Sequence, residues 1–220
     1  MALTREKLAQ MIDHTELKPN ATAERIRELC KEALEYNFGA VCVNSCNVGI
    51  AAEELGGSDI AICSVVGFPL GAMITEAKAF EAKAAIRNGA TEIDMVMNIG
   101  DFKSDKDRSV VEDIRSVVSA ADGNTVKVIL ETGYLSEEEI RRACRLVEDA
   151  GAHFVKTSTG FGPRGASIDD VRIMNDTVGG RLGIKAAGGI GTLKDAKSMI
   201  EAGATRIGAS RGKTILEGFE

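Results

Sequence analysis

The strongest constraint on the fold is the alternation of short strand-like runs with helical patterns along the whole chain. Eight runs rich in apolar and β-branched residues are typical of strands, at 11–14, 40–44, 60–67, 92–98, 126–131, 154–158, 182–187 and 206–209. Helical patterns lie between them, at 23–36, 76–88, 109–121, 136–150, 167–176 and 193–202, with weaker ones at 48–55 and 214–219. Eight strands that each precede a helix predict a compact (β/α)8 barrel, or TIM barrel, as a single domain over residues 1–220.

An open, doubly wound α/β sheet is the alternative fold. Its usual G-x-G-x-x-G turn after the first strand is absent between residues 11 and 19, which favours the barrel. The helix ends are also marked. Left-handed glycine C-caps are predicted from the turns that contain Gly39, Gly89, Gly151 and Gly203. N-caps are predicted at Ser136, which is followed by Glu139, and at Thr192.

Composition limits the classes of partner. The formal net charge is −6, so nothing indicates nucleic acid or an anionic membrane as a partner. No run is long enough to cross a bilayer, and the charged segment 1–10 lacks the apolar core of a signal peptide. The five cysteines are scattered without a zinc-binding pattern, so we expect reduced thiols in a cytoplasmic protein and no metal.

Charged residues interrupt several predicted strands. Lys156, Lys185 and Asp94 have mostly apolar neighbours in the sequence, and so do Lys127 and Glu131. Side chains alternate between the two faces of a strand, so these neighbours share one face and the charges take the other. A buried lysine is rarely placed for stability, because its charged amine loses hydration. We therefore expect a barrel whose inner face carries an active site at its mouth.

Lys156 and Lys185 are predicted to lie near each other on the sixth and seventh strands. Catalytic groups in such barrels come from the C-terminal ends of the strands, and neighbouring strands are only about 4.8 Å apart. An unperturbed lysine at pH 7 is neutral about one time in 10^3. A second nearby ammonium group and partial burial both favour the neutral, nucleophilic amine. The alternative is a purely structural ion pair, for example between Lys156 and Asp94.

Glycine-rich loops after the last three strands predict a phosphate site. Glycine lets backbone N–H groups approach an anion, and a helix N-terminus adds a favourable partial charge. The loops after strands seven and eight are the usual phosphate site of this architecture. Tight packing is the alternative role of such glycines. The candidate residues are Gly188, Gly189, Gly208 and Ser210, with Thr157 and Gly160 after the sixth strand.

Six segments resemble the deoxyribose-phosphate aldolase family. They are Ile-Asp-His-Thr at 12–15, Val-Gly-Phe-Pro-Leu-Gly at 66–71, Glu-Ile-Asp-Met-Val at 92–96, Lys-Val-Ile-Leu-Glu-Thr-Gly at 127–133, Val-Lys-Thr-Ser-Thr-Gly-Phe at 155–161 and Gly-Ile-Lys-Ala-Ala-Gly-Gly-Ile at 183–190. The motifs are specific and span nearly the whole chain. Members of this family are Schiff-base aldolases that interconvert 2-deoxyribose 5-phosphate with acetaldehyde and glyceraldehyde 3-phosphate, without a metal or cofactor.

The resemblance also implies residue roles. Lys156 would form the Schiff base, Lys185 would be the second lysine that favours its neutral form, and Asp94 would take part in proton transfer. Asp13 and Lys127 would belong to the surrounding polar network, and the glycine loops would hold the phosphate of a phosphosugar. A homo-oligomer, dimer or tetramer, is expected. Some family members end in a tail whose tyrosine reaches the site, whereas this sequence ends in Gly-Phe-Glu at 218–220.

Two other function classes remain open from the residues alone. Another Schiff-base aldolase or a transaldolase would share Lys156 but accept a different carbonyl donor. A phosphosugar-binding barrel without chemistry would keep the glycine loops, but it would not need the buried lysine pair. A phosphosugar isomerase would need a carboxylate base and an electrophile at the strand ends, and no His–Glu pair is placed for it. Of the remaining polar residues, we expect Cys42 to border the site, Glu131 to join the network or pair with Lys127, and His14 and His153 to make hydrogen bonds.

Overall fold

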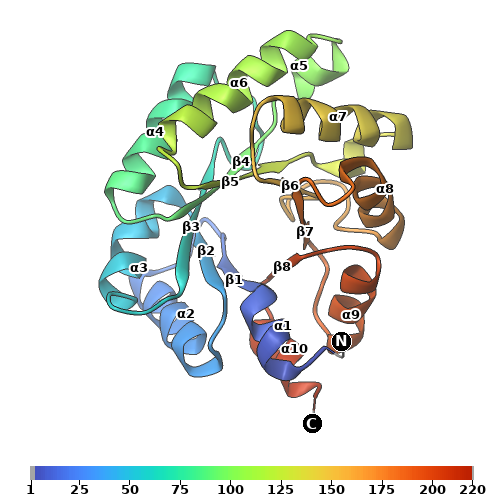
Figure 1. Ribbon diagram of the computed structural model, residues 1–220. Helices are drawn as coiled ribbons and strands as arrows, with labels where there is room; N and C mark the ends of the chain where they lie inside the picture. Colours follow the sequence, from blue (N-terminus) through green and yellow to red (C-terminus); the bar gives the residue numbers. More distant parts are fainter. Residues whose placement is uncertain (1–2, 220) are drawn as a thin grey trace.

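The chain forms a closed barrel of eight parallel strands inside a ring of helices (Figure 1). The computed structural model describes residues 3–219. Neighbouring strands pair in sequence order, and β8 pairs with β1 to close the barrel, which confirms the predicted fold and excludes the open sheet. The strands are β1 (Ile12–Glu16), β2 (Ala40–Val43), β3 (Ala61–Val66), β4 (Glu92–Val96), β5 (Thr125–Ile129), β6 (Phe154–Lys156), β7 (Gly183–Ala187) and β8 (Arg206–Ala209).

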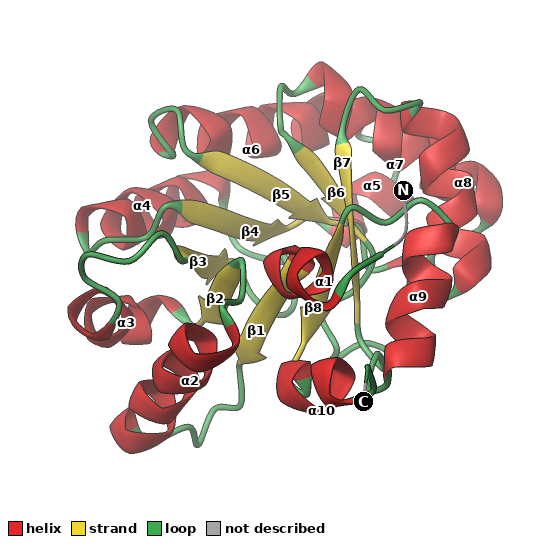
Figure 2. Ribbon diagram, turned by 60° about the horizontal axis from the view of Figure 1, so that its bottom comes forward, coloured by secondary structure: helices red, strands yellow, loops and turns green. Residues whose placement is uncertain are grey.

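The eight predicted helices are all present, with ends that differ from the predicted ones by at most a few residues. They are α2 (Ala23–Tyr36), α3 (Val48–Glu54), α4 (Thr75–Arg87), α6 (Asp107–Ala120), α7 (Glu137–Asp149), α8 (Ile168–Val178), α9 (Leu193–Glu201) and α10 (Gly212–Glu217). Two short helices were not predicted, α1 (Arg5–Met11) and α5 (Ile99–Lys103). Helix α1 lies over the end of the barrel where the strands begin (Figure 2), and its Leu8 and Ala9 are buried there.

In the strands that carry charges, side chains alternate between the two faces of the strand as predicted. In β4, Ile93 and Met95 face outward into the main apolar core, which lies between the barrel and the helices. Their neighbour Asp94 points inward and is fully buried. The same alternation places Lys127 of β5 inside the barrel, between the outward-facing Val126 and Val128. The barrel interior is therefore largely polar, while its outer surface supplies the core.

Most of the predicted helix caps are present. Ser136 and Glu139 form a capping box at α7, and Gly89, Gly151 and Gly203 have φ angles of 109°, 81° and 119°. The prediction for Gly39 is wrong, because the left-handed residue after α2 is Asn37, with φ 54°. Gly39 is required by packing instead: a β-carbon there would lie 2.2 Å from the carbonyl oxygen of Gln10, at the end of α1.

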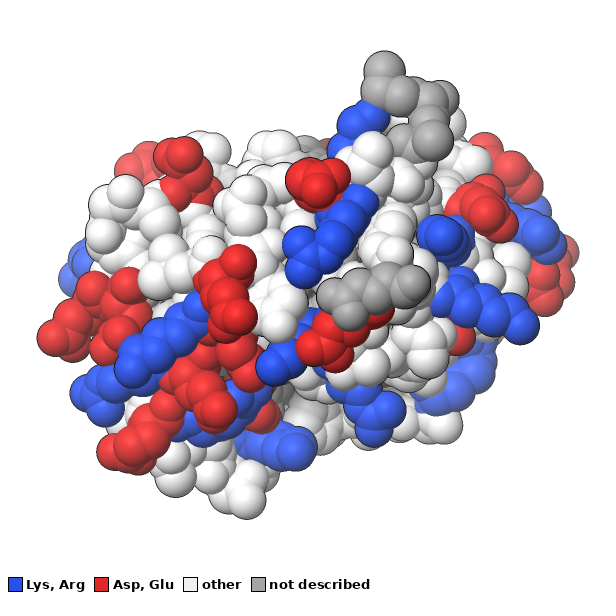
Figure 3. All heavy atoms as spheres, turned by 90° about the horizontal axis from the view of Figure 1, so that it is seen from below, with Lys and Arg blue, Asp and Glu red and all other residues white. Residues whose placement is uncertain are grey.

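Charged side chains of both signs lie on the surface of the molecule. On the face seen in Figure 3, acidic and basic side chains are interspersed, and neither sign forms a continuous field. Among residues 3–219, no helix combines the length and the apolar character that crossing a membrane requires.

Candidate active site

The two predicted lysines meet inside the barrel. Lys156 ends β6 and is the register partner of Lys185 in β7, so both side chains take the inner face. Each amine lies 2.7 Å from the same oxygen, Asp94 Oδ2. The three side chains are almost completely buried. The predicted proximity of the lysines and the alternative ion pair between Lys156 and Asp94 are thus both present.

A wider ion network surrounds this pair. Lys127 donates to Asp94 Oδ1 at 2.8 Å and lies 2.6 Å from Glu92 Oε2. Asp13 accepts from Lys185 and also binds Arg206 Nη1 at 3.3 Å. The sequence analysis had placed Lys127 and Asp13 in such a network, and the structure brings both to it.

Glu92 and Arg206 were missed as members of this network. The second nitrogen of Arg206 bonds Glu92 Oε1 at 2.5 Å. Each residue stands at the first position of its strand, where a charged side chain is normally assigned to solvent. Closure of the barrel brings these two strand starts within reach of each other's side chains. The sequence did offer one indication for Glu92. It lies two residues before Asp94, and side chains two residues apart in a strand point to the same face.

The network fixes the charge of its members. Burial alone would raise the pKa of Asp94, but the ammonium groups of Lys127, Lys156 and Lys185 hold it well below its usual range. Burial likewise favours a higher pKa for Asp13, and the nearby cations lower it. Burial favours a lower pKa for Lys127 and Lys185, but the surrounding carboxylates raise both above the usual lysine value. Asp94 is therefore a carboxylate, and Lys185 remains an ammonium ion.

Lys156 differs from the other two lysines in its partners. It contacts one carboxylate, Asp94, whereas Lys185 contacts two and Lys127 two at close range. The network as a whole contains four cationic side chains and three carboxylates, which are Lys127, Lys156, Lys185 and Arg206 against Asp13, Glu92 and Asp94. The cationic side chains of the network therefore outnumber its carboxylates by one.

A cavity of about 540 Å³ opens at the C-terminal ends of the strands. Of the three network lysines only Lys156 lines it. Its wall includes five of the six residues predicted for the phosphate site, Gly160, Gly188, Gly189, Gly208 and Ser210. An amine and a set of glycine loops thus face the same space.

The glycines of this cavity serve two purposes. A β-carbon on Gly188 would lie 2.9 Å from Gly165 Cα, and one on Gly208 would lie 3.0 Å from the Cε atom of Lys185. These two glycines leave room for a loop and for a network lysine. Gly160 and Gly189 have φ angles of 87° and 81°, and a β-carbon on either would meet no atom within 4 Å. Their backbones are open to the cavity.

Two backbone N–H groups directly before α9 are already bound to a carboxylate, which limits the expected role of this turn toward an anion. Asp195 Oδ2 accepts from the backbone N–H groups of Gly191 at 3.2 Å and Thr192 at 3.0 Å. Thr192 returns the contact by accepting from the Asp195 N–H group, which completes a capping box. Hydrogen bonds from Thr192 and Gly191 lower the pKa of Asp195, so the cap is negatively charged. The N–H groups of Gly191 and Thr192 are therefore not free for phosphate.

Thr157 and Glu131 take positions other than those expected. The Thr157 hydroxyl donates to the carbonyl oxygen of Ala187 and accepts from its N–H group, both at 3.1 Å, so it joins β6 to β7 behind the cavity wall. Glu131 does not pair with Lys127. It accepts from the Thr159 N–H group at 3.2 Å and from the Thr159 hydroxyl, and so holds the loop after β6.

Both histidines make hydrogen bonds outside the barrel interior, as expected. His14 Nε2 lies 2.6 Å from Glu32 Oε2, and His153 Nδ1 accepts from the N–H group of Val126 at 3.0 Å. Neither lines the cavity.

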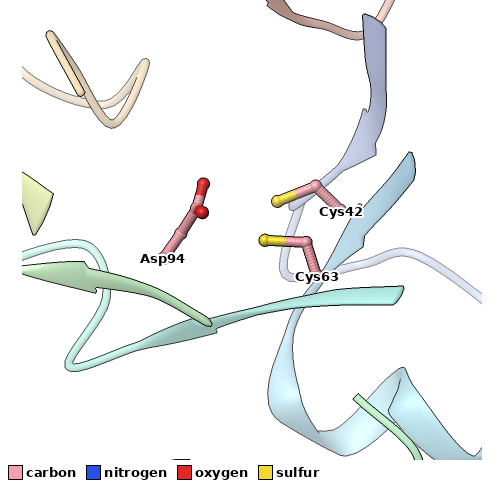
Figure 4. Close-up of side chains that lie close together, drawn as sticks. All are labelled: Cys42, Cys63 and Asp94. Atoms are coloured by element: carbon pink, nitrogen blue, oxygen red, sulfur yellow. The ribbon is translucent and has the colours of Figure 1, made fainter. Parts of the chain in front are cut away.

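Cys42 and Cys63 lie beside the network. They are register partners in β2 and β3, and both thiols point toward Asp94 (Figure 4). The ligand atoms of these three residues lie within 4.8 Å of one another, a spacing that can suit a metal. However, Asp94 already accepts from three ammonium groups, and Lys127 lies 3.4 Å from Cys63 Sγ. A metal ion would have to displace these cations, so the donor set does not fit one.

Comparisons with known proteins agree on one family. A family profile described as DeoC/LacD family aldolase matches residues 7–218. A deoxyribose-phosphate aldolase of Aciduliprofundum boonei is 59% identical over 216 residues, 97% of each chain. The same-named protein of Staphylococcus epidermidis is 56% identical over 212 residues, 96% of each chain. The tetrameric deoxyribose phosphate aldolase of Aeropyrum pernix superimposes with a TM-score of 0.90 at 35% identity, covering 98% of this chain and 92% of that one.

Proposed function

The chain belongs to the DeoC/LacD family of aldolases and is a lyase, and on that premise we propose that it cleaves 2-deoxy-D-ribose 5-phosphate to acetaldehyde and D-glyceraldehyde 3-phosphate. Lys156 forms the covalent intermediate. The observation that carries this assignment is that Lys156 alone among the three network lysines lines the cavity and contacts a single carboxylate. A nucleophilic amine must be reachable by the substrate, and among the three network lysines the position of Lys156 in the cavity wall meets this condition.

The reaction begins with attack by the neutral amine of Lys156 on the substrate aldehyde. Loss of water gives an iminium ion at C1, which accepts the electron pair of the C2–C3 bond once a base removes the C3 hydroxyl proton and C3 becomes the aldehyde of glyceraldehyde 3-phosphate. Protonation and hydrolysis of the resulting enamine release acetaldehyde and restore the amine. The carboxylate of Asp94 lies 2.7 Å from the Lys156 amine and is the group in direct contact with it for proton transfer. Lys185, an ammonium ion on the same oxygen, keeps Asp94 ionised and in place.

The 5-phosphate binds in the glycine loops at the same cavity. Within residues 3–219, the backbone N–H groups of Gly189 and Ile190 form no hydrogen bond, and both residues line the cavity with Ser210. These donors and the Ser210 hydroxyl supply the hydrogen bonds of the phosphate oxygens.

The test is a retro-aldol assay with two readouts. Purified protein is given deoxyribose 5-phosphate, and acetaldehyde and glyceraldehyde 3-phosphate are each measured by reduction with a coupled NADH-dependent enzyme. The wild type should form both products in equal amounts, and Lys156→Met should form neither. As a control, Lys103→Met removes an exposed lysine that pairs with Glu139 and should retain the full rate. Cleavage of a ketose phosphate but not of this aldose would assign a different carbonyl donor, such as that of a transaldolase.

We further propose a cytoplasmic homo-oligomer that takes part in the catabolism of deoxyribose phosphate. Four large apolar side chains close together in the sequence are exposed, and single chains rarely expose such a group without a partner. They are Leu70, Met73, Ile74 and Phe80. All five cysteines are free, as is normal in a reducing compartment. Light scattering should give a mass of two or four chains, and Phe80→Asp should lower it.

A further inference from the structure

The turn before α9 places a negative charge beside the proposed phosphate site. The N–H groups of Gly191 and Thr192, directly before the helix, are bound to the Asp195 carboxylate at the edge of the glycine loop. A phosphate monoester carries nearly two negative charges at pH 7. Positive charge from a side chain in the same wall of the cavity would offset the phosphate charge more fully than neutral backbone N–H groups do.

Arg211 is placed to supply this charge. It directly follows Ser210 after β8, lines the cavity and is exposed there. Its side chain lies over the glycine loop, since a β-carbon built on Gly191 would be 3.4 Å from its Cδ atom and 3.5 Å from its Nη1 atom. Within residues 3–219 no carboxylate pairs with it. By contrast, Arg206, five residues earlier, is bound to both Asp13 and Glu92.

Lys18 is a second cation on the same side of the mouth. It follows β1, which pairs with β8, so the loops after β7, β8 and β1 lie in consecutive order around the barrel. Lys18 lines the cavity, and its amine has no carboxylate partner in the described part of the chain. The acidic side chain in this wall is Glu16, which is engaged by Arg25 at 3.4 Å and by the Lys18 N–H group at 3.1 Å.

We infer that Arg211 is the residue that recognises the phosphate of the substrate, with Lys18 as a weaker second contact. The inference rests on the proposed function and deepens it by naming the group that makes the enzyme selective for phosphorylated sugars. The planar guanidinium can donate two parallel hydrogen bonds to phosphate oxygens while the N–H groups of Gly189 and Ile190 bind the others. Arg211 does not touch the reacting carbons, so it acts on substrate binding and orientation.

The experiment compares two sugars on matched variants. Steady-state kinetics are measured with deoxyribose 5-phosphate and with unphosphorylated deoxyribose, on the wild type and on Arg211→Ala, Arg211→Lys and Lys18→Ala. Removing a charged hydrogen-bond donor should lower kcat/KM for the phosphosugar by about 10- to 100-fold, mainly through KM. Deoxyribose should change by less than roughly twofold, because it lacks the group that Arg211 binds. Arg211→Lys should restore part of the loss, and Lys18→Ala should have a smaller effect of the same kind. Arg108→Ala, which removes an exposed arginine on α6, is the control and should change neither sugar.

A second readout separates this inference from the proposed function. Inorganic phosphate should bind the wild type in a calorimetric titration and should bind Arg211→Ala at least about 10-fold more weakly. Wild-type protein that binds phosphate through Arg211 but does not cleave deoxyribose 5-phosphate would reject the proposed reaction and keep the phosphate contact. Equal losses on both sugars, or an unchanged KM for the phosphosugar and an unchanged affinity for inorganic phosphate, would overturn the role of Arg211.

Discussion

Replacing Lys185 with leucine tests whether a fixed neighbouring cation makes Lys156 nucleophilic. The substitution removes the positive charge that shares Asp94 Oδ2 with Lys156. Asp13 keeps Arg206, and Asp94 keeps Lys127, so each carboxylate retains a partner. The ammonium form of Lys156 should then be more favourable, and a higher pH should be needed to obtain the neutral amine.

The size of this effect follows from the geometry. Both amines lie 2.7 Å from one oxygen, so the two nitrogens are at most about 5.4 Å apart, twice that distance. At an effective dielectric constant of about 20, two unit charges at this separation repel by about 3 kcal/mol. Since one pH unit corresponds to about 1.36 kcal/mol, the rising limb of kcat/KM against pH should move upward by about 2 units.

The assay is the pH dependence of kcat/KM for deoxyribose 5-phosphate, measured on variants whose circular dichroism matches the wild type. Lys78→Leu is the control. Lys78 is also fully buried and ion-paired, to Asp113 at 2.6 Å, but it lies between α4 and α6, away from the cavity. This control should lose stability and keep the wild-type pH profile. A Lys185→Leu variant with the wild-type rate and profile would refute the paired-lysine reasoning.

Three further outcomes are expected. Asp94→Asn should lower kcat by about 10²- to 10⁴-fold, the usual range for a proton-transfer group, yet still allow borohydride trapping of an imine; loss of trapping together with kcat would place Asp94 in amine attack instead. Gly189→Val should raise KM for deoxyribose 5-phosphate much more than for deoxyribose, whereas Gly180→Val, at a similar φ of 79° and also in open space, should raise neither; equal losses on both sugars would make Gly189 structural. The carboxyls of Asp13 and Asp94 have lowered folded-state pKa values, so their stabilising effect is present above the unfolded value of about 3.9 and is lost as pH falls below it. Thermal melts should therefore show a midpoint that is steady near neutrality and drops below about pH 4, and a constant midpoint down to pH 3 would contradict the network.

Much of the site was predictable because strand geometry is regular. Alternation assigned Lys156, Lys185, Asp94 and Lys127 to the inner face, and the parallel register of a barrel then brought them together. The glycines after β7 and β8 were predictable for a related reason, since loops that follow neighbouring strands meet at one mouth. These inferences depend on local periodicity and on strand order, both of which are written in the sequence.

The remaining parts depend on contacts between distant segments. Arg206 and Glu92 occupy the first positions of β8 and β4, and only closure of the barrel turns them toward each other. The Thr192–Asp195 capping pair can be recognised in the sequence. That Asp195 also binds the N–H group of Gly191 depends on how the glycine loop packs against α9. Helices α1 and α5 have seven and five residues, and α1 runs directly into β1, so neither stands out as a separate helical pattern between two strands. The position of the Arg211 side chain over Gly191 depends on how the loops after β7 and β8 pack together, which local sequence patterns do not specify.

The covalent identity of the intermediate is the most direct test of the central claim. The protein is incubated with acetaldehyde or deoxyribose 5-phosphate, reduced with borohydride, digested and mapped by mass spectrometry. Since an iminium ion is reducible, the account predicts loss of activity and a single modified lysine, Lys156. Modification spread over exposed lysines with activity retained, or a label on Lys185 or Lys127 in place of Lys156, would contradict it.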